Sequence, residues 1–116
     1  MANPETVTPN TQRGQVARDD SGAPLGWNKV AITLAAPTTT VVKATPGVLH
    51  SITFNKPVAT GVVTVYDAAS ATGTAVAIIT TPASPMPVTL IYDMRMDTGI
   101  TITSATAAQD ITVTYI

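Results

Sequence analysis

The chain has 116 residues, which indicates one domain, and 45% of them are apolar, enough to build a core. Charged residues make up only 11%, against about 25% in an average globular protein, and the net charge is −1. Nothing in this composition suggests a nucleic-acid partner, which would need a basic surface, so we expect none. It also leaves little charge to keep copies apart, so we expect the chain to work within an assembly.

Cysteine is absent from the chain. Disulfides, thiol nucleophiles and zinc–thiolate sites are therefore excluded together, and assembly in a reducing cytosol is favoured. The first six residues show no basic segment followed by an apolar one, so no signal peptide is predicted. No apolar run approaches the roughly 20 residues of a membrane helix, so we expect no membrane partner.

Residues 1–29 differ in composition from the rest of the chain. They hold three prolines, three glycines and six of the thirteen charged residues, namely Glu5, Arg13, Arg18, Asp19, Asp20 and Lys29. Such a segment cannot bury enough surface to offset its own ordering. It is either a flexible tail or an extended arm that becomes ordered on a neighbouring subunit. Leu25 and Trp27 favour an anchored end, because burying a tryptophan is a large apolar gain.

From Val30 onward the sequence predicts one strand after another. Apolar and polar residues alternate as in half-buried strands, and glycines and prolines separate the runs. The expected strands are 30–34, 38–44, 48–55, 61–67, 74–80, 88–96, 100–103 and 111–115. The runs 48–55 and 61–67 flank a short link that holds Pro57, and they predict a β-hairpin.

Eight short strands at spacings of about 8–12 residues predict an all-β fold. We expect a single antiparallel β-sandwich, of jelly-roll or Greek-key type, over residues 30–116, preceded by the extended N-terminal arm 1–29. In the run 48–55, Val48, His50, Ile52 and Phe54 form the better core face. The predicted core elsewhere consists of Val63, Val65, Leu90, Tyr92, Ile100, Ile102, Ile111 and Val113.

His50 is the only histidine of the chain. Acid–base or serine chemistry would need a partner residue beside it, and a zinc ion would need further ligands. Because His50 lies in the middle of a predicted strand, a structural role is the favoured interpretation. Gly22 and Gly26 precede no amphipathic helix, so they do not form a phosphate-binding loop.

Three acidic residues, Asp93, Asp97 and Asp110, carry oxygen atoms that suit calcium, but their spacing does not match an EF-hand. A solvated cluster around Arg95 is the favoured interpretation. One tryptophan, three tyrosines and one phenylalanine are too few for a platform that stacks on nucleic-acid bases or sugars. We therefore predict no enzyme activity and no catalytic, cofactor-binding or metal-binding residue.

Four stretches of the chain share a pattern of short strands joined by small residues. They are VKATPGVLHSITFN at 42–55, GVVTVYD at 61–67, TGITI at 98–102 and DITVTY at 110–115. Together they resemble a family of small β-sandwich structural proteins of tailed bacteriophages. The resemblance covers about residues 40–116. It implies a virion protein of the capsid-decoration or head-fibre type, with no active site.

If the resemblance holds, the partner is the major capsid protein. The chain would bind the capsid exterior as a homo-oligomer, a trimer, and stabilise the shell as a decoration or cement protein assembled in the host cytoplasm. The arm would contribute by pairing with a neighbour's sheet edge. Two alternatives stay open: a tail-fibre, baseplate or receptor-binding subunit, and a non-viral carbohydrate-binding or adhesin module. The second usually carries a signal peptide and an aromatic strip.

Overall fold

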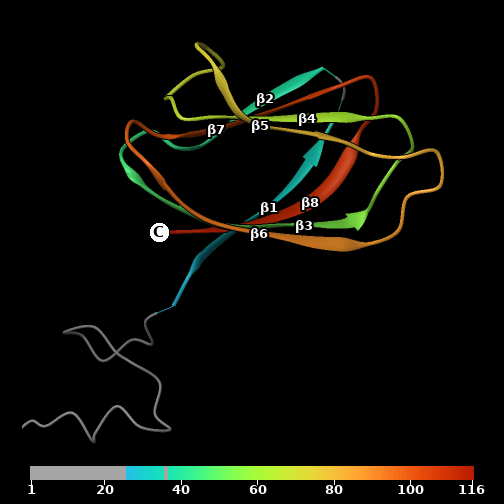
Figure 1. Ribbon diagram of the computed structural model, residues 1–116, viewed down its shortest axis with the longest axis horizontal. Helices are drawn as coiled ribbons and strands as arrows, with labels where there is room; N and C mark the ends of the chain where they lie inside the picture. The colour runs from blue at the N-terminus through green and yellow to red at the C-terminus, as the bar shows by residue number, and fades with distance from the viewer. Residues whose placement is uncertain (1–25, 36) are drawn as a thin grey trace, which may run out of the picture.

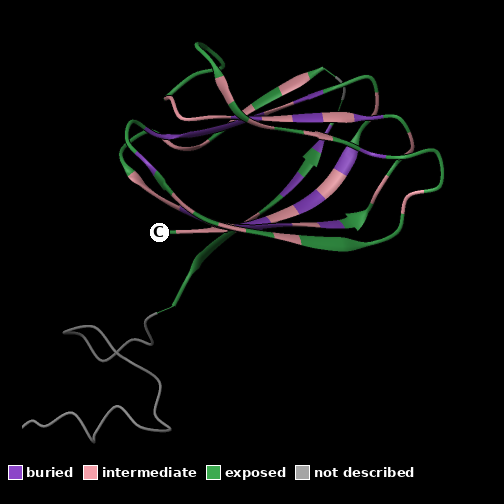
Figure 2. Ribbon diagram, viewed as in Figure 1, coloured by how far each residue is buried: buried purple, intermediate pink, exposed green. Residues whose placement is uncertain are grey.

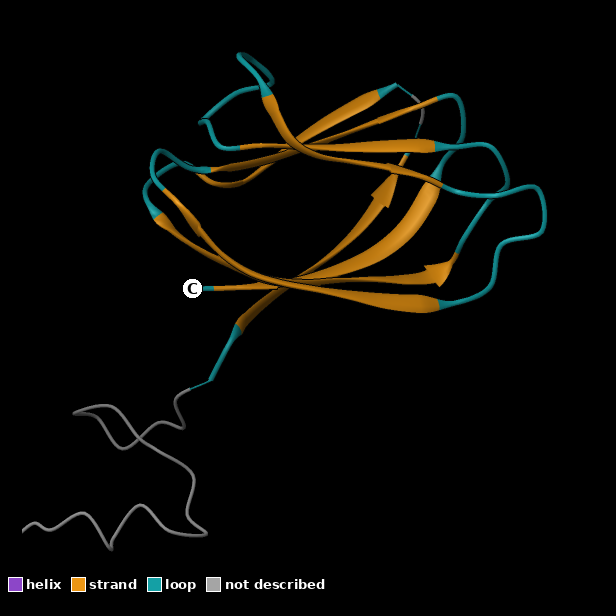
Figure 3. Ribbon diagram, viewed as in Figure 1, coloured by secondary structure: helices purple, strands orange, loops and turns teal. Residues whose placement is uncertain are grey.

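A computed structural model describes residues 26–35 and 37–116, which form strands and loops (Figure 3). Residues 1–25, most of the predicted arm with Leu25 and Gly22, lie outside the described residues. Eight strands follow one another: β1 (Asn28–Leu34), β2 (Thr38–Lys43), β3 (Gly47–Lys56), β4 (Val62–Tyr66), β5 (Ala75–Thr80), β6 (Val88–Met96), β7 (Ile100–Ala105) and β8 (Gln109–Tyr115).

The strands form two four-stranded antiparallel sheets, with the orders β1-β8-β3-β6 and β2-β7-β4-β5, that face each other as a sandwich (Figure 1). Strand β1 pairs with β8, β2 with β7, β3 with β6 and β4 with β5. These four pairs are nested like one long hairpin that has been rolled up. That nesting is the jelly-roll arrangement, so the predicted β-sandwich is confirmed.

The predicted hairpin between 48–55 and 61–67 is wrong. Strand β3 lies in one sheet and β4 in the other, so the link between them crosses the sandwich (Figure 1). The buried side chain of Gln109 holds this link: its Oε1 accepts a hydrogen bond from the Val58 amide, and its Nε2 donates to the Val58 carbonyl, both at 2.9 Å. Thr81 supports the same loop by accepting from the Gly61 amide at 2.8 Å. Contacts with residues distant in sequence therefore decide where the link goes.

The core lies between the two sheets, and buried residues recur along the strands of both sheets (Figure 2). Burying a large aliphatic or aromatic side chain contributes about 1.5–3 kcal/mol, so this layer is the main source of stability. In the described part of the chain the buried apolar residues are Ile32, Leu34, Leu49, Ile52, Phe54, Val63, Val65, Met96, Ile100, Ile102, Ile111 and Val113.

Six of the eight predicted core residues are fully buried, and two are not. Leu90 and Tyr92 are half-buried and pack against the margin of the core. Both belong to β6, the last strand of its sheet, which leaves them covered on one side only. The alternation in 88–96 identified the correct face of β6 but not its position at the edge.

A bulge in β3 changes the predicted core face of that strand. Leu49 pairs with Tyr115 and Ser51 with Thr114, which leaves His50 as an extra residue between them. Leu49 is therefore fully buried, whereas Val48 and His50 are half-buried, contrary to the strict alternation expected for 48–55. Beyond the bulge, Ile52 and Phe54 occupy the core as predicted.

Candidate interaction surfaces

The first candidate surface is a cluster of Trp27, His50 and Asp93 on the sheet β1-β8-β3-β6. The rings of Trp27 and His50 stack in parallel, with centroids 4.0 Å apart and planes 2° apart. The Nδ1 of His50 donates a hydrogen bond to the Oδ1 of Asp93, because an ionised carboxylate can only accept. Trp27 stays 45% exposed, so it rests on the domain surface instead of entering the core.

Backbone irregularities bring the cluster together. His50 is the extra residue of the β3 bulge, and the register of β6 shifts at the same level, between Ile91 and Met94. Asp93 lies in this shifted part of β6 and has a φ of 46°, in the left-handed region. Bulges re-aim side chains in this way. His50 therefore lies between Asp93 and Trp27, the residue that directly precedes β1.

The three acidic residues that the sequence offered for calcium do not converge. Asp93 contacts His50, whereas Asp97 pairs with Arg95, whose Nε lies 2.9 Å from its Oδ1. Asp110 is the register partner of Thr33 and Lys56, at the opposite end of the sheet from Asp93. Within residues 26–35 and 37–116, no group of three or more His, Asp or Glu side chains is arranged to hold a metal ion.

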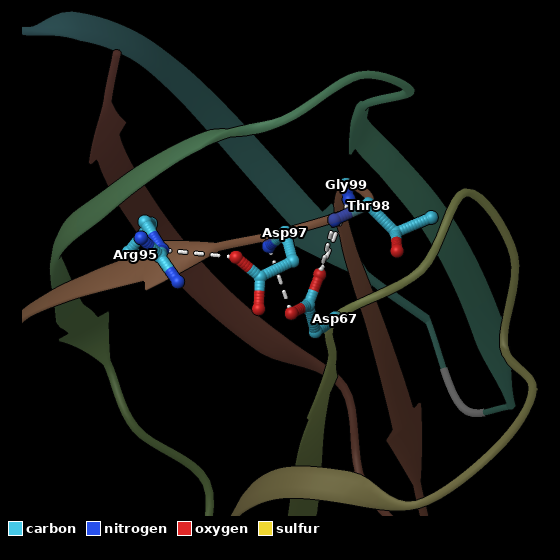
Figure 4. A network of polar contacts seen from close by, with 5 residues as sticks. All are labelled: Asp67, Arg95, Asp97, Thr98 and Gly99. Atoms are coloured by element: carbon cyan, nitrogen blue, oxygen red, sulfur yellow. Dashed lines mark hydrogen bonds and ion pairs between the residues drawn. The ribbon is translucent and has the colours of Figure 1, made fainter.

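A fourth acidic residue, Asp67, organises the turn between β6 and β7 (Figure 4). Its carboxylate accepts backbone hydrogen bonds from Asp97 at 2.8 Å, Thr98 at 2.7 Å and Gly99 at 3.3 Å. The bond from the Asp97 amide, followed by that from Thr98, lowers the pKa of Asp67 below its ordinary value. The sequence predicted one strand ending at Asp67 and the strands 88–96 and 100–103, but it did not connect Asp67 with the residues between those two strands.

Hydroxyl and amide side chains cover much of the outer face of β1-β8-β3-β6. Ser51 and Thr114 share a hydrogen bond of 2.5 Å between their hydroxyls, and Thr53 and Thr89 one of 2.9 Å. Asn55 extends this set by donating to Thr112 at 3.0 Å. Such cross-strand pairs stabilise the outer side of this sheet.

Charged residues are divided unequally between the two sheets. The strands of β1-β8-β3-β6 carry five of them, Lys29, Lys56, Asp93, Arg95 and Asp110, in addition to His50. The four strands of β2-β7-β4-β5 carry one, Lys43. Its register partner is the core residue Ile100, so Lys43 lies on the core side, at the end of β2. The outer face of β2-β7-β4-β5 therefore contains no charged strand residue.

Threonine and aliphatic side chains, with Tyr66 of β4 among them, form this uncharged outer face. One row crosses all four strands through register partners, from Thr39 to Thr103, Thr64 and Ile78. Ile78 is 67% exposed on β5, and Val41 and Val76 are also exposed. We call the outward residues of these four strands the uncharged face. Alternation in 74–80 places Val76 and Ile78 on one side of the strand, but it does not tell which side faces the core.

No helix in the part of the chain that the structure describes is long and apolar enough to cross a membrane. Comparison of the chain with protein-family models, with curated proteins and with solved structures finds no significant match.

Proposed function

We propose that this protein is a non-enzymatic structural protein of a phage virion, which binds the exterior of the capsid and stabilises it. The observation that carries the proposal is the two-sided character of the sandwich. One sheet bears the charged residues and the anchored Trp27, and the other presents the uncharged face. A domain built in this way has two different surfaces for two different neighbours.

The resemblance of residues 40–116 to small structural proteins of tailed phages supports the same proposal. The jelly-roll topology also agrees, because many virion proteins use it. A fold alone does not define a function, and lectin-like modules share this topology. The two-sided surface and the motifs therefore support the proposal, in which the major capsid protein is the partner and a trimer is the form that binds.

In this proposal the N-terminal arm makes the contact with the shell. Trp27 stacks on His50, and His50 is hydrogen-bonded to Asp93. The end of the arm at Trp27 is therefore attached to the sheet β1-β8-β3-β6, which carries most of the charged strand residues. Twenty-five residues precede the described part of the chain. Fully extended, they reach about 80 Å, enough to cross a neighbouring subunit and pair with the edge of its sheet.

Stabilisation would follow from mass action. A protein that binds the assembled shell but not its free subunits stabilises the shell by RT ln(1 + [L]/Kd), which is about 2.7 kcal/mol per site at a hundredfold excess over Kd. Repeated over many sites, this energy opposes the outward pressure of packaged DNA. The gain depends only on binding, so no catalytic residue is needed.

The test compares phage particles that carry the protein with particles that lack it, under heat and under chelator. We expect particles without the protein to lose their DNA at a lower temperature. Adding purified protein should restore the difference, and a variant lacking residues 1–25 should not, although its β-domain remains folded by circular dichroism. This deletion leaves Trp27 and all of β1 in place.

If particles without the protein are equally robust but fail to adsorb to host cells, the decoration proposal is wrong. The tail-fibre or receptor-binding alternative then replaces it, since adsorption is the step that such a subunit serves.

A further inference from the structure

We propose that the uncharged face is the surface through which copies of this chain associate, with Ile78 on β5 at its exposed edge. This inference concerns the purified protein and does not depend on the identity of its partner. It names the occupant of the face as a second copy of the same chain.

The distribution of charge favours a second copy over a charged partner. Burying charged groups at an interface is costly unless each finds a partner, and the buried centres of protein interfaces are depleted of charge. The strands of the uncharged face contribute no charge to its surface, whereas the strands of the opposite sheet contribute five charged residues. Two copies that meet through the uncharged face bury threonine and aliphatic groups without desolvating an ion.

Strand β5, one of the two edge strands of this sheet, is the least protected of the four edge strands in the sandwich. Exposed edge strands invite pairing with other chains, and proteins usually guard them with charged residues. Of the described edge strands, β1 carries Lys29, β2 ends at Lys43, and β6 carries Asp93 and Arg95. Strand β5, with the sequence AVAIIT, has no charged residue, and Ile78 in it is 67% exposed.

The size of the face sets the expected strength of association. Four strands about 4.8 Å apart and five or six residues long, at about 3.4 Å per residue, span a face of roughly 350 Å². A standard stable interface buries about 800 Å² on each partner. The uncharged face is smaller than that, in the range of weak and transient contacts, so we expect association that is reversible and depends on concentration.

Sedimentation equilibrium of the full-length protein from low to high micromolar concentration tests the inference. We expect the wild type to self-associate as its concentration rises, and Ile78→Lys to raise the dissociation constant about tenfold or more, because it places a charge in the contact. The matched control is Ile91→Lys, which alters an isoleucine 60% exposed on β6 in the opposite sheet. This control should associate like the wild type.

A second variant tests whether any effect of Ile78→Lys is confined to the immediate surroundings of Ile78. Thr39→Lys changes the exposed residue at the other end of the row that contains Ile78, and it should weaken association in the same way. Circular dichroism and the urea midpoint establish that each variant is folded. A wild type that stays monomeric at every concentration overturns the inference. So does an assembly that survives both Ile78→Lys and Thr39→Lys, or one that only Ile91→Lys disrupts.

Discussion

At the scale of single residues, Asp67 shows how one carboxylate can fix a turn. It lies just after β4, and its oxygens accept amide hydrogens from three consecutive residues of the β6–β7 turn. Gly99 completes this arrangement, because a Cβ at that position would lie 2.7 Å from the Lys43 carbonyl oxygen and 2.8 Å from that of Ala68. The turn thus depends on a charge at one position and on the absence of a side chain at another.

Because these bonds favour the ionised carboxylate, the stability of the protein should fall in acid through Asp67. A group whose pKa is lower in the folded state stabilises that state above its ordinary pKa, here 3.8, and this contribution is lost as the pH falls through the lowered value. We expect Asp67→Asn to be less stable than the wild type at pH 7 and to lose less stability between about pH 5 and pH 2. Urea midpoints across this range measure both effects.

The control for this experiment is Asp97→Asn. Asp97 forms an exposed pair with Arg95, and exposed pairs contribute little, so its acid profile should follow that of the wild type. Parallel losses in wild type and Asp67→Asn would contradict the role assigned to Asp67.

Gln109 is a second residue whose contribution the structure makes explicit. Its buried amide pairs with both backbone groups of Val58, as a neighbouring strand would. Replacing it with leucine removes both hydrogen bonds to Val58, and the loss of two such bonds together costs about 1–3 kcal/mol. We expect Gln109→Leu to lower the free energy of unfolding by that amount, measured by urea denaturation.

The exposed residue Asn55, which donates to Thr112, offers a matched control for Gln109→Leu. Changing it to leucine should alter the stability by less than about 0.5 kcal/mol, as for most surface substitutions. Equal losses in the two variants would mean that burial of the amide is not what matters at Gln109.

At the scale of elements, the bulge in β3 decides which residues face the core. With His50 as an extra residue, Leu49 is buried and Val48 is only half-buried. We expect Leu49→Ala to cost about 2–5 kcal/mol, the usual range for a large buried side chain, and Val48→Ala to cost less than half as much. Chemical denaturation of the two variants compares them directly. If Val48→Ala were the more damaging change, the bulge would be misplaced and the simple alternation would hold.

The strand positions could be predicted from sequence because each strand has its own alternating pattern between turn-forming residues. The pairing of the strands could not, since a pattern in 48–55 or 61–67 says which side is apolar but not which sheet the strand joins. The partner of Val58 is Gln109, 51 positions away. The cluster of Trp27, His50 and Asp93 could not be predicted from the sequence either, because it forms only where the registers of β3 and β6 shift beside each other.

At the scale of the whole molecule, the nested pairing makes sequence separation increase steadily from the innermost pair to the outermost. Strands β4 and β5 are consecutive, whereas β1 and β8 lie at the two ends of the described chain. The uncharged face combines strands from near the start, the middle and the end of this order. Such a surface could not be identified from one segment, since it exists only after the sandwich has closed.

Because Asn28 pairs with Tyr115, the sandwich can be reconnected as a circular permutant. A short linker from Ile116 to Gly26, with new ends in the exposed loop at Thr72, would turn β8 and β1 into the innermost hairpin and make β4 and β5 the outermost pair. We expect the permutant to reach the same sheets, with an unchanged circular dichroism spectrum. Loop closure favours pairs that are near in sequence, so pulsed hydrogen exchange should find the earliest protected amides in β8–β1 instead of β4–β5. If the earliest protection stayed in β4–β5, the local sequence of that hairpin, and not the order of the strands along the chain, would determine which pair forms first.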